Sequence, residues 1–415
     1  MINNISSNIL KIVTISFIII YTITPSYTKL FGNPVYRLAV ICFFVFSFYY
    51  IIRKKININI FIYFSVVSFL QLITFAINLE YDRIITEILA VWLPLMLLYL
   101  MIKDNYDLIN TIISCILFSC FIICCFGVVE EIWQFNIFSL IENYHFENNH
   151  IGSVSSFRWG MYRIEQSFNT ALTYALYLQL CAGICIYKCI STNECKYKLL
   201  LLLISVNLFF TVSRGISVCY CLQLITTYFI LWNRTIDLRR MGKFVLVFIV
   251  FFIFVSINPF DIFGSVSRTL ESAFGVIFGI NSNFTDDSMT LRNGFQSVFL
   301  KDFSSSIYSI VFGFGEIGSR KFDTLDNNWM YILSKSGVVG LLSFCMLNYI
   351  VVKKMFIVLR NSNRDDSEFQ FVVSLGVAVL FYLLSLYTVA QMEDVRIYVV
   401  CLAILIAFPC QIKSN

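Results

Sequence analysis

Charged residues are scarce in this sequence of 415 residues, because Asp, Glu, Lys and Arg together make up only 13% of it. An ordinary soluble domain carries about 25% charged residues, so this composition cannot supply the water-facing surface of a soluble enzyme of this size. The 14 cysteines fall in or beside apolar runs. A soluble enzyme, a disordered chain and a disulfide-stabilised secreted scaffold are therefore excluded.

Residue patterns that bind divalent metal ions are missing as well. No Asp-x-Asp motif occurs, and the only two histidines, His145 and His150, lack a metal-ligand spacing. Two acidic groups come nearest to such a pattern, Glu80-Tyr81-Asp82 and Asp286-Asp287. We therefore expect a reaction that uses no metal ion and no cofactor.

Apolar segments near the roughly 20 residues that a membrane-spanning helix requires recur along the whole chain. The sequence is 59% hydrophobic and has a mean hydropathy of +0.79. This pattern predicts an all-α, polytopic transmembrane protein that forms one membrane domain over residues 1–415, with about twelve spans. The predicted spans are 8–24, 35–52, 58–78, 84–102, 108–128, 167–187, 199–213, 216–232, 244–259, 329–352, 370–390 and 396–412.

The distribution of Lys and Arg predicts the orientation of these spans, since basic residues near span ends stay in the cytoplasm. Most of them, including the Arg53-Lys54-Lys55 cluster, fall on the side that carries both termini. Both termini are therefore expected in the cytoplasm, and the long segments 129–166 and 260–328 on the outer face. In the second segment, Val266–Phe278 and Ser288–Phe299 have the pattern of short amphipathic helices. The net charge of +5 suits anionic membrane lipids and gives no case for nucleic acid.

Arginines on the predicted outer face are the main candidates for a binding site. Arg214 lies between two apolar spans, where a charge that reaches the hydrocarbon is costly, so it is a functional candidate. Arg158 and Arg163 precede the sixth span, and Arg268 and Arg292 lie on the two amphipathic stretches. We expect these guanidinium groups to converge over one outer cavity and to bind a diphosphate. For Arg158 and Arg268, anchoring to lipid headgroups is an equally good interpretation.

Four motifs in the second half of the chain resemble a known family. Asp326-Asn327, nine residues and then Gly337-Val338-Val339-Gly340 is similar to the His-Asn and Gly-x-x-Gly pattern of the O-antigen ligase and polymerase superfamily. Three further stretches resemble that superfamily in the same order: Arg158-Trp159-Gly160 through Ser167-Phe168-Asn169, Thr211-Val212-Ser213-Arg214-Gly215, and Arg292 followed by Gly313-Phe314-Gly315. The resemblance in motifs covers about residues 155–345.

The superfamily has two branches, and Asp326 resembles the polymerase branch, because the ligases have His at this position. The resemblance implies a GT-C-like fold in the bacterial inner membrane. It also implies an enzyme that polymerises undecaprenyl-diphosphate-linked oligosaccharide repeats into O-antigen or a similar surface polysaccharide at the periplasmic face. A chain-length regulator protein and a flippase are the partners that this resemblance implies.

Inverting glycosyl transfer requires a base for the acceptor hydroxyl and a group that stabilises the departing diphosphate. Asp326 is the expected base, and Glu165 is a rival for that role. Arg214 and Arg292, with Arg163, are expected to stabilise the leaving group. The expected substrate-binding residues are Arg158, Arg163, Asn169, Arg268 and Asn327.

Three other functions remain open from the sequence. An O-antigen ligase, which transfers glycan to lipid A core, shares the motifs except for the histidine. A lipid-linked oligosaccharide transporter would also have about twelve spans, but such transporters show internal repeats and charges deep in their spans, and neither is evident here. A scaffold protein of a surface complex would leave the arginine and Asp-Asn pattern unexplained.

Overall fold

The computed structural model describes most of the chain in segments. These segments are residues 2–24, 28–30, 33–52, 58–103, 105–136, 138, 157–158, 161–168, 170–232, 287–319, 327–363, 366–388 and 396–408. The predicted ninth span, the predicted helix Val266–Phe278 and both histidines lie outside the described residues.

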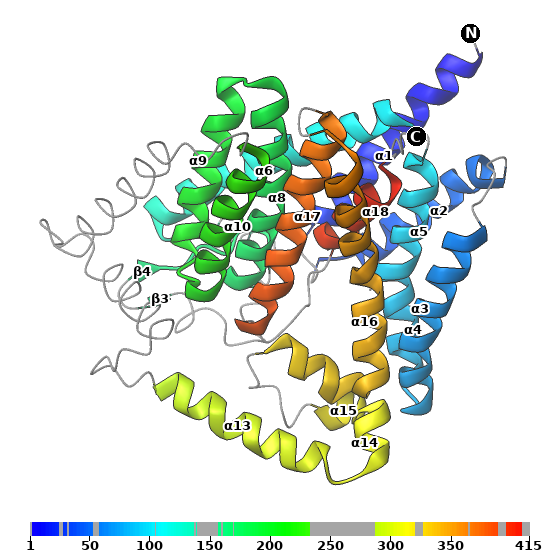
Figure 1. Cartoon of the computed structure of the whole chain (residues 1–415), viewed down its shortest axis with the longest axis vertical. Coiled ribbons are helices and arrows are strands. Elements are labelled where there is room, and N and C mark those ends of the chain that lie inside the picture. The colour runs from blue at the N-terminus through cyan, green and yellow to red at the C-terminus, as the bar shows by residue number, and fades with distance from the viewer. Residues whose placement is uncertain are drawn as a thin grey trace, which may run out of the picture.

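The described residues form helices and two very short antiparallel hairpins (Figure 1). The helices are α1 (Ile2–Ile23), α2 (Val35–Ile52), α3 (Ile58–Ile77), α4 (Tyr81–Glu87), the π-helix η1 (Ile88–Trp92), α5 (Leu93–Ile102), α6 (Tyr106–Trp133), α8 (Ala171–Thr192), α9 (Cys195–Phe210), α10 (Arg214–Trp232), α13 (Asp287–Phe303), α14 (Ile307–Phe312), α15 (Gly315–Ser319), α16 (Asn328–Asn361), α17 (Ser367–Ser385), the 3-10 helix η4 (Leu386–Thr388) and α18 (Arg396–Ala407). Strand β1 (Lys29–Leu30) pairs with β2 (Asn33–Pro34), and β3 (Phe157–Arg158) pairs with β4 (Met161–Tyr162).

Each predicted span except the ninth coincides with a helix or with a continuous helical run. Among the described residues, six helical segments are long and apolar enough to cross a membrane, and four shorter helices are also apolar. This finding confirms the helical, membrane-spanning class, while the number of spans stays a prediction. The helix predicted at Ser288–Phe299 is also confirmed, because α13 covers it; of its predicted apolar face, Phe299 is fully buried and Val298 is exposed.

Several predicted boundaries were wrong by a turn or more. The fifth span does not end at residue 128, because α6 continues to Trp133 and ends where Gln134 adopts a left-handed backbone, with φ 51°. The sixth begins later than predicted, at Ala171, because the Thr170 hydroxyl accepts from the Thr173 amide and caps α8. The segment between these helices is therefore shorter than the predicted loop 129–166 at one end and longer at the other.

Pro94 lies within the fourth predicted span without breaking its helical run. A proline has no amide hydrogen, so the carbonyl four residues earlier loses its helical partner. That carbonyl belongs to Ala90, in the π-helical turn η1, and it accepts a hydrogen bond from the Tyr21 hydroxyl of α1. Packing against a neighbouring helix thus satisfies the group that proline leaves open.

The beginning of α1 and the end of α18 lie at one end of the helical bundle, and α13 to α15 lie at the other (Figure 1). The Arg396 guanidinium at the start of α18 donates to the Thr24 carbonyl just after α1, at 2.6 Å, and Lys354 of α16 donates to the Phe408 carbonyl just after α18. Because α18 therefore runs antiparallel to α1, the beginning of α1 and the end of α18 lie at the same end of the bundle (Figure 1). Helices α13, α14 and α15 lie at the opposite end.

Helices α13 to α15 are held to α16 by a small apolar core of their own. Phe299 of α13 is fully buried there, and its partners are Phe303, Phe314, Met330 and Leu333. The rings of Phe299 and Phe303 lie 5.3 Å apart, and those of Phe303 and Phe314 lie 6.4 Å apart. This core fixes the three short helices beneath the first turns of α16.

Candidate functional site

Two of the glycine motifs that resemble the superfamily meet in the structure. Gly337 breaks α16 with φ 62° and ψ −163°, a backbone conformation that is essentially restricted to glycine, and Gly313 adopts a similar one after α14. A Cβ atom on Gly313 would lie 2.6 Å from the Gly337 nitrogen. The Phe314 amide donates to the Ser334 carbonyl at 2.7 Å. The two motifs therefore build the bend of α16 through direct backbone contact.

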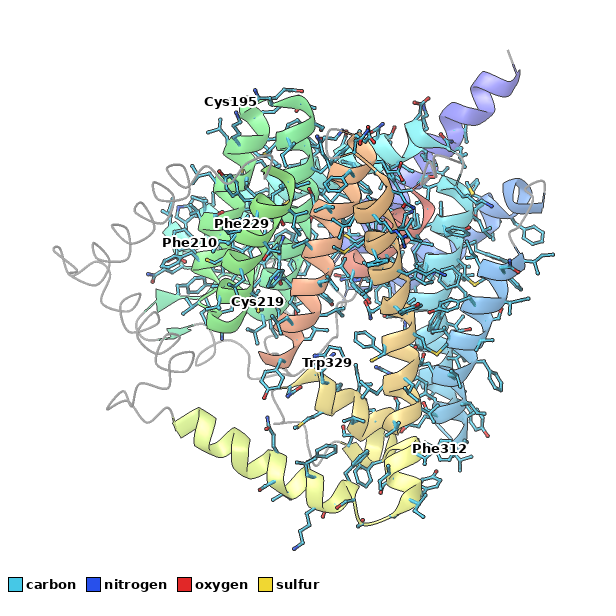
Figure 2. The ribbon with its side chains drawn as sticks, viewed as in Figure 1. Cys195, Phe210, Cys219, Phe229, Phe312 and Trp329 are labelled. Atoms are coloured by element: carbon cyan, nitrogen blue, oxygen red, sulfur yellow. The ribbon has the colours of Figure 1, made fainter. Side chains whose placement is uncertain are left out.

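The α3–α4 turn supports the other side of α14. The Asn78 side chain donates to the Phe312 carbonyl at 3.1 Å, and the Tyr308 hydroxyl donates to the Asn78 side-chain oxygen at 3.2 Å. The bent first part of α16, α14 and the α3–α4 turn thus form one unit. Figure 2 shows Phe312 of this unit at the lower right of the molecule.

A cavity of about 320 Å³ lies between the bent part of α16 and helices α2, α3 and α4. We call it the cationic cavity, because Arg37, Arg83 and Lys335 line it and Glu87 is the lining carboxylate. Its other lining residues are Tyr36, Gln71, Phe75, Thr86, Ala90, Val91, Asn328, Tyr331, Ile332, Ser336, Gly340, Ser343, Phe344, Leu347 and Tyr398. The volume is at the lower end of the about 300–1,000 Å³ found for small-molecule sites.

Neighbouring side chains hold the charged groups of the cationic cavity in place. Arg37 donates to the Thr86 hydroxyl at 3.1 Å, and the Gln71 amide donates to the Glu87 carboxylate at 2.5 Å. The ammonium group of Lys335, which is 6% exposed, lies 3.9 Å from the centre of the Tyr331 ring. Ionisable side chains in membrane-spanning helices mark functional sites by default, because their burial is costly.

Asn328 lines this cavity with a buried side chain whose hydrogen-bonding groups are unsatisfied among the described residues. It is 1% exposed, and neither its side-chain oxygen nor its nitrogen has a hydrogen-bond partner among the described residues. A buried amide without partners costs about 1–3 kcal/mol for each unsatisfied group. The adjacent Asn327 is different, since its side chain accepts from the Trp329 and Met330 amides and caps α16.

A second polar cluster lies at the end of α6, where a turn packs on it. We call residues 162–168 with Glu130 the acidic turn. Glu130 is fully buried, and its carboxylate accepts from the Tyr162 hydroxyl at 3.3 Å and from the backbone amides of Glu165 and Gln166 at 3.2 and 3.0 Å. The Gln166 side chain donates to it as well. Glu130 therefore anchors the turn, with both its oxygens occupied.

The acidic turn also contacts the segment before Arg214. The Arg163 guanidinium donates to the Thr211 carbonyl at 3.2 Å, and the Ile164 amide donates to the Phe210 carbonyl at 3.4 Å. Two stretches that resemble the superfamily are thus side by side. Figure 2 shows Phe210 on the side of the molecule opposite Phe312.

Burial and charge tune the ionisation of Glu165 in this turn. Burial raises the pKa of its carboxyl group to about 7, while the nearby Arg163 cation lowers the pKa and Glu130 raises it. Burial in turn lowers the pKa of Arg163. A carboxyl group with a pKa near 7 is suited to proton transfer at neutral pH.

Some predicted site residues have described side chains, some have only a described backbone, and some lie outside the described residues. Glu165 and Arg163 lie together in the acidic turn, and Asn327 caps α16. For three more residues the backbone is described: Arg158 lies in β3, Arg214 begins α10 and Arg292 lies on α13. Asp326, Asn169 and Arg268 lie outside the described residues. The predicted convergence of all these arginines over one outer cavity therefore stays a prediction.

Glu130, Asn328 and the three cations of the cavity were not among the predicted site residues. The sequence held a signal for Glu130, namely two adjacent carboxylates directly after an apolar run. Arg37 and Lys335 lie in the first two turns of predicted spans and Arg83 directly precedes one, as do many residues that only anchor a span. Nothing in their spacing indicates that they share a cavity.

The apolar helices and the charged groups at their ends define a multi-pass helical membrane protein. Comparison with the models of known protein families finds no match, and comparison with curated proteins finds none either. Within the described residues, no group of three or more His, Cys, Asp or Glu side chains could hold a metal ion.

Proposed function

We propose that this protein polymerises lipid-linked oligosaccharide repeats at the periplasmic face of the bacterial inner membrane, as an inverting glycosyltransferase. The observation that carries the proposal is the contact of the acidic turn with residues 210 and 211: this turn holds Glu165, a carboxyl group whose pKa is raised by burial, beside the Arg163 cation. Arg163 in turn donates to Thr211, the first residue of the segment that resembles the Ser-Arg-Gly motif of the O-antigen polymerases. A candidate base and a candidate diphosphate-binding segment are thus adjacent.

The reaction assigns a separate task to each charge. The carboxylate accepts the proton of the acceptor hydroxyl, whose oxygen forms the new bond to the anomeric carbon. The bond from that carbon to the diphosphate oxygen breaks, and the diphosphate leaves with the electron pair. Arg214, Arg292 and Arg163 stabilise the negative charge on the leaving group. Arg158, Asn169, Arg268 and Asn327 bind the two undecaprenyl-diphosphate-linked substrates.

The two carboxylates of the acidic turn, Glu130 and Glu165, have different roles in this proposal. Both oxygens of Glu130 already accept hydrogen bonds from the turn, so Glu130 has a structural role. Glu165 uses its backbone amide for that contact, and its carboxyl group, which accepts a hydrogen bond from the Ala171 amide and lies near Arg163, is the one that we assign to proton transfer. Asp326, directly before Asn327, is the alternative base.

The lipopolysaccharide pattern of a deletion strain tests the proposed function. Loss of a polymerase leaves core oligosaccharide with a single repeat on a gel, and the ladder of longer chains disappears. Loss of a ligase or of a transporter leaves core without any repeat. Core without repeats in the deletion strain would therefore contradict the polymerase proposal and favour one of those two functions.

Arg214→Lys tests the binding of the diphosphate directly. Lysine keeps the charge but cannot make the bidentate contacts of a guanidinium group, so we expect shortened or absent chains at normal protein levels in the membrane. Long chains in this variant would remove Arg214 from the site.

Reporter fusions at Asn148 and Asn283 test the proposed orientation. Both positions lie in segments that the sequence predicts to be periplasmic, so an export-dependent reporter should be active at each. Cytoplasmic activity at both positions would place the site on the wrong face for this reaction.

A further inference from the structure

The cationic cavity contains hydrogen-bonding groups that the described part of the protein does not satisfy. Asn328 lines it with both side-chain atoms buried and without hydrogen-bond partners among the described residues. Small residues keep the space beside it open, because Ser336, Gly340 and Ser343 line the same wall on α16. A ligand in this space would find one amide donor and one amide acceptor ready to bind.

The charges on the cavity wall favour an anion. Among the described residues, three lining side chains are cationic, Arg37, Arg83 and Lys335, and one is anionic, Glu87. The Glu87 carboxylate accepts from Gln71, at 2.5 Å. The net charge of these lining side chains is thus positive. The low dielectric constant of the surrounding protein strengthens their attraction for an anion.

The positions of the cations indicate where the anion comes from. Arg37 is the third residue of α2 and Arg83 the third of α4, and Lys335 lies two residues before the bend of α16. Ends of membrane-spanning helices lie near the level of lipid headgroups. Apolar side chains complete the wall, including Phe75, Val91 and Leu347.

We propose that the cationic cavity is a binding site for the phosphate or diphosphate group of an anionic lipid. The guanidinium groups of Arg37 and Arg83 donate to the phosphate oxygens, Lys335 supplies a point charge, and the Asn328 amide donates to the same group. The apolar wall contacts the first carbons of the lipid chain. The proposal does not rest on the proposed function, because the assigned residues whose side chains the structure describes, Arg163, Glu165 and Asn327, do not line this cavity.

Binding measurements on the purified, full-length protein in phosphatidylcholine nanodiscs test this site. The probes are farnesyl diphosphate, inorganic diphosphate and a short-chain phosphatidylglycerol, each titrated by microscale thermophoresis. The test variants are Asn328→Asp, which adds a negative charge with almost no change in shape, and Lys335→Gln. Lys301→Gln is the matched control, because Lys301 is an exposed cation on α13, at the same end of the molecule.

We expect both test variants to weaken binding about 10- to 100-fold, the effect of losing a charge-assisted contact, while Lys301→Gln binds like the wild type. The preferred probe identifies the source. Preference for farnesyl diphosphate indicates a prenyl carrier, preference for phosphatidylglycerol a membrane phospholipid, and equal binding of inorganic diphosphate a free anion. Each of these results supports the site. No binding of any probe, or equal binding by the wild type and the test variants, would overturn the proposal.

Folding of the variants is checked by size-exclusion chromatography and thermal unfolding. If Asn328→Asp does not fold, Arg83→Gln replaces it, because Arg83 lies on α4 outside the bent helix. The outcome is also distinct from that of the proposed function. A protein that binds these probes through the cavity but shows no role in polymerisation would retain the site and lose only the enzyme assignment.

Discussion

The acidic turn and the cationic cavity differ in how the fold treats a buried polar side chain. In the acidic turn, Glu130 is fully buried and receives hydrogen bonds from two backbone amides and two side chains. In the cationic cavity, Asn328 is equally buried and receives none from the described residues. Satisfied groups hold a fold together, whereas buried groups that the fold leaves unsatisfied are available to a ligand. We therefore assign Glu130 a structural role and Asn328 a role in binding a ligand.

Glu165→Gln should produce the largest effect on activity. Loss of a general base lowers the rate by about 10² to 10⁴-fold, so elongation of lipid-linked repeats by the purified protein should nearly stop. Asp326→Asn is the matched variant. Retained activity in Glu165→Gln with loss in Asp326→Asn would transfer the role of base away from the acidic turn, toward the start of α16.

Gly337→Ala should be the most destabilising of these changes, because it disturbs the bend of α16, next to Lys335 and Ser336 in the wall of the cationic cavity. A methyl group there would adopt a strained backbone conformation and would lie 2.6 Å from the Gly313 nitrogen, which together cost about 2–6 kcal/mol. Thermal unfolding in detergent measures the loss. Gly294→Ala on α13 is the control, since a Cβ atom there meets nothing within 4 Å and should leave the melting temperature unchanged or slightly higher.

Glu130→Gln should destabilise the acidic turn by about 1–3 kcal/mol. The new amide group would face the Glu165 and Gln166 amides, which need an acceptor, and one of them would lose its partner. Glu131→Gln is the neighbouring control, because Oε2 of Glu131 has no hydrogen-bond partner among the described residues. Equal melting temperatures for the two variants would mean that Glu130 does not anchor the turn.

The dependence of activity on pH should follow Glu165. As a base it works when ionised, so activity should rise as the pH rises through about 7. Arg163→Gln removes the cation that lowers this pKa and should move the rise to higher pH, whereas Arg163→Lys should not. The contribution of Glu165 to stability has the opposite sign. Its folded-state pKa is above the ordinary value of 4.5, so stability falls as the pH rises from about 4.5 to 7.

Chelation of metal ions should have the smallest effect. Arginines and lysines supply the positive charge in both regions, so EDTA should leave the rate of elongation unchanged. Activity that is lost in EDTA and restored by magnesium or manganese would overturn the metal-free mechanism. It would return attention to the predicted acidic pairs at Glu80 and Asp286.

Part of the site could be predicted from sequence. Position and charge picked out Arg163 and Glu165, and the resemblance picked out the Thr211–Gly215 segment; the structure places them side by side through the bond from Arg163 to Thr211. Glu130 was missed because the fifth span was predicted to end at residue 128, which placed Glu130 in an outer loop. The helix continues to Trp133 instead, since the turn supplies donors that satisfy the buried charge.

The sequence by itself determined the class of this protein, its main helices and the presence of helix α13. These features depend on the length and period of apolar runs, which are local properties of the chain. Only the tertiary structure decided that Arg37, Arg83 and Lys335 share a cavity and that Asn328 lies in its wall. The reason is physical. Whether a buried polar group is satisfied depends on partners that are tens to hundreds of residues away in sequence, and only packing brings them within hydrogen-bonding distance.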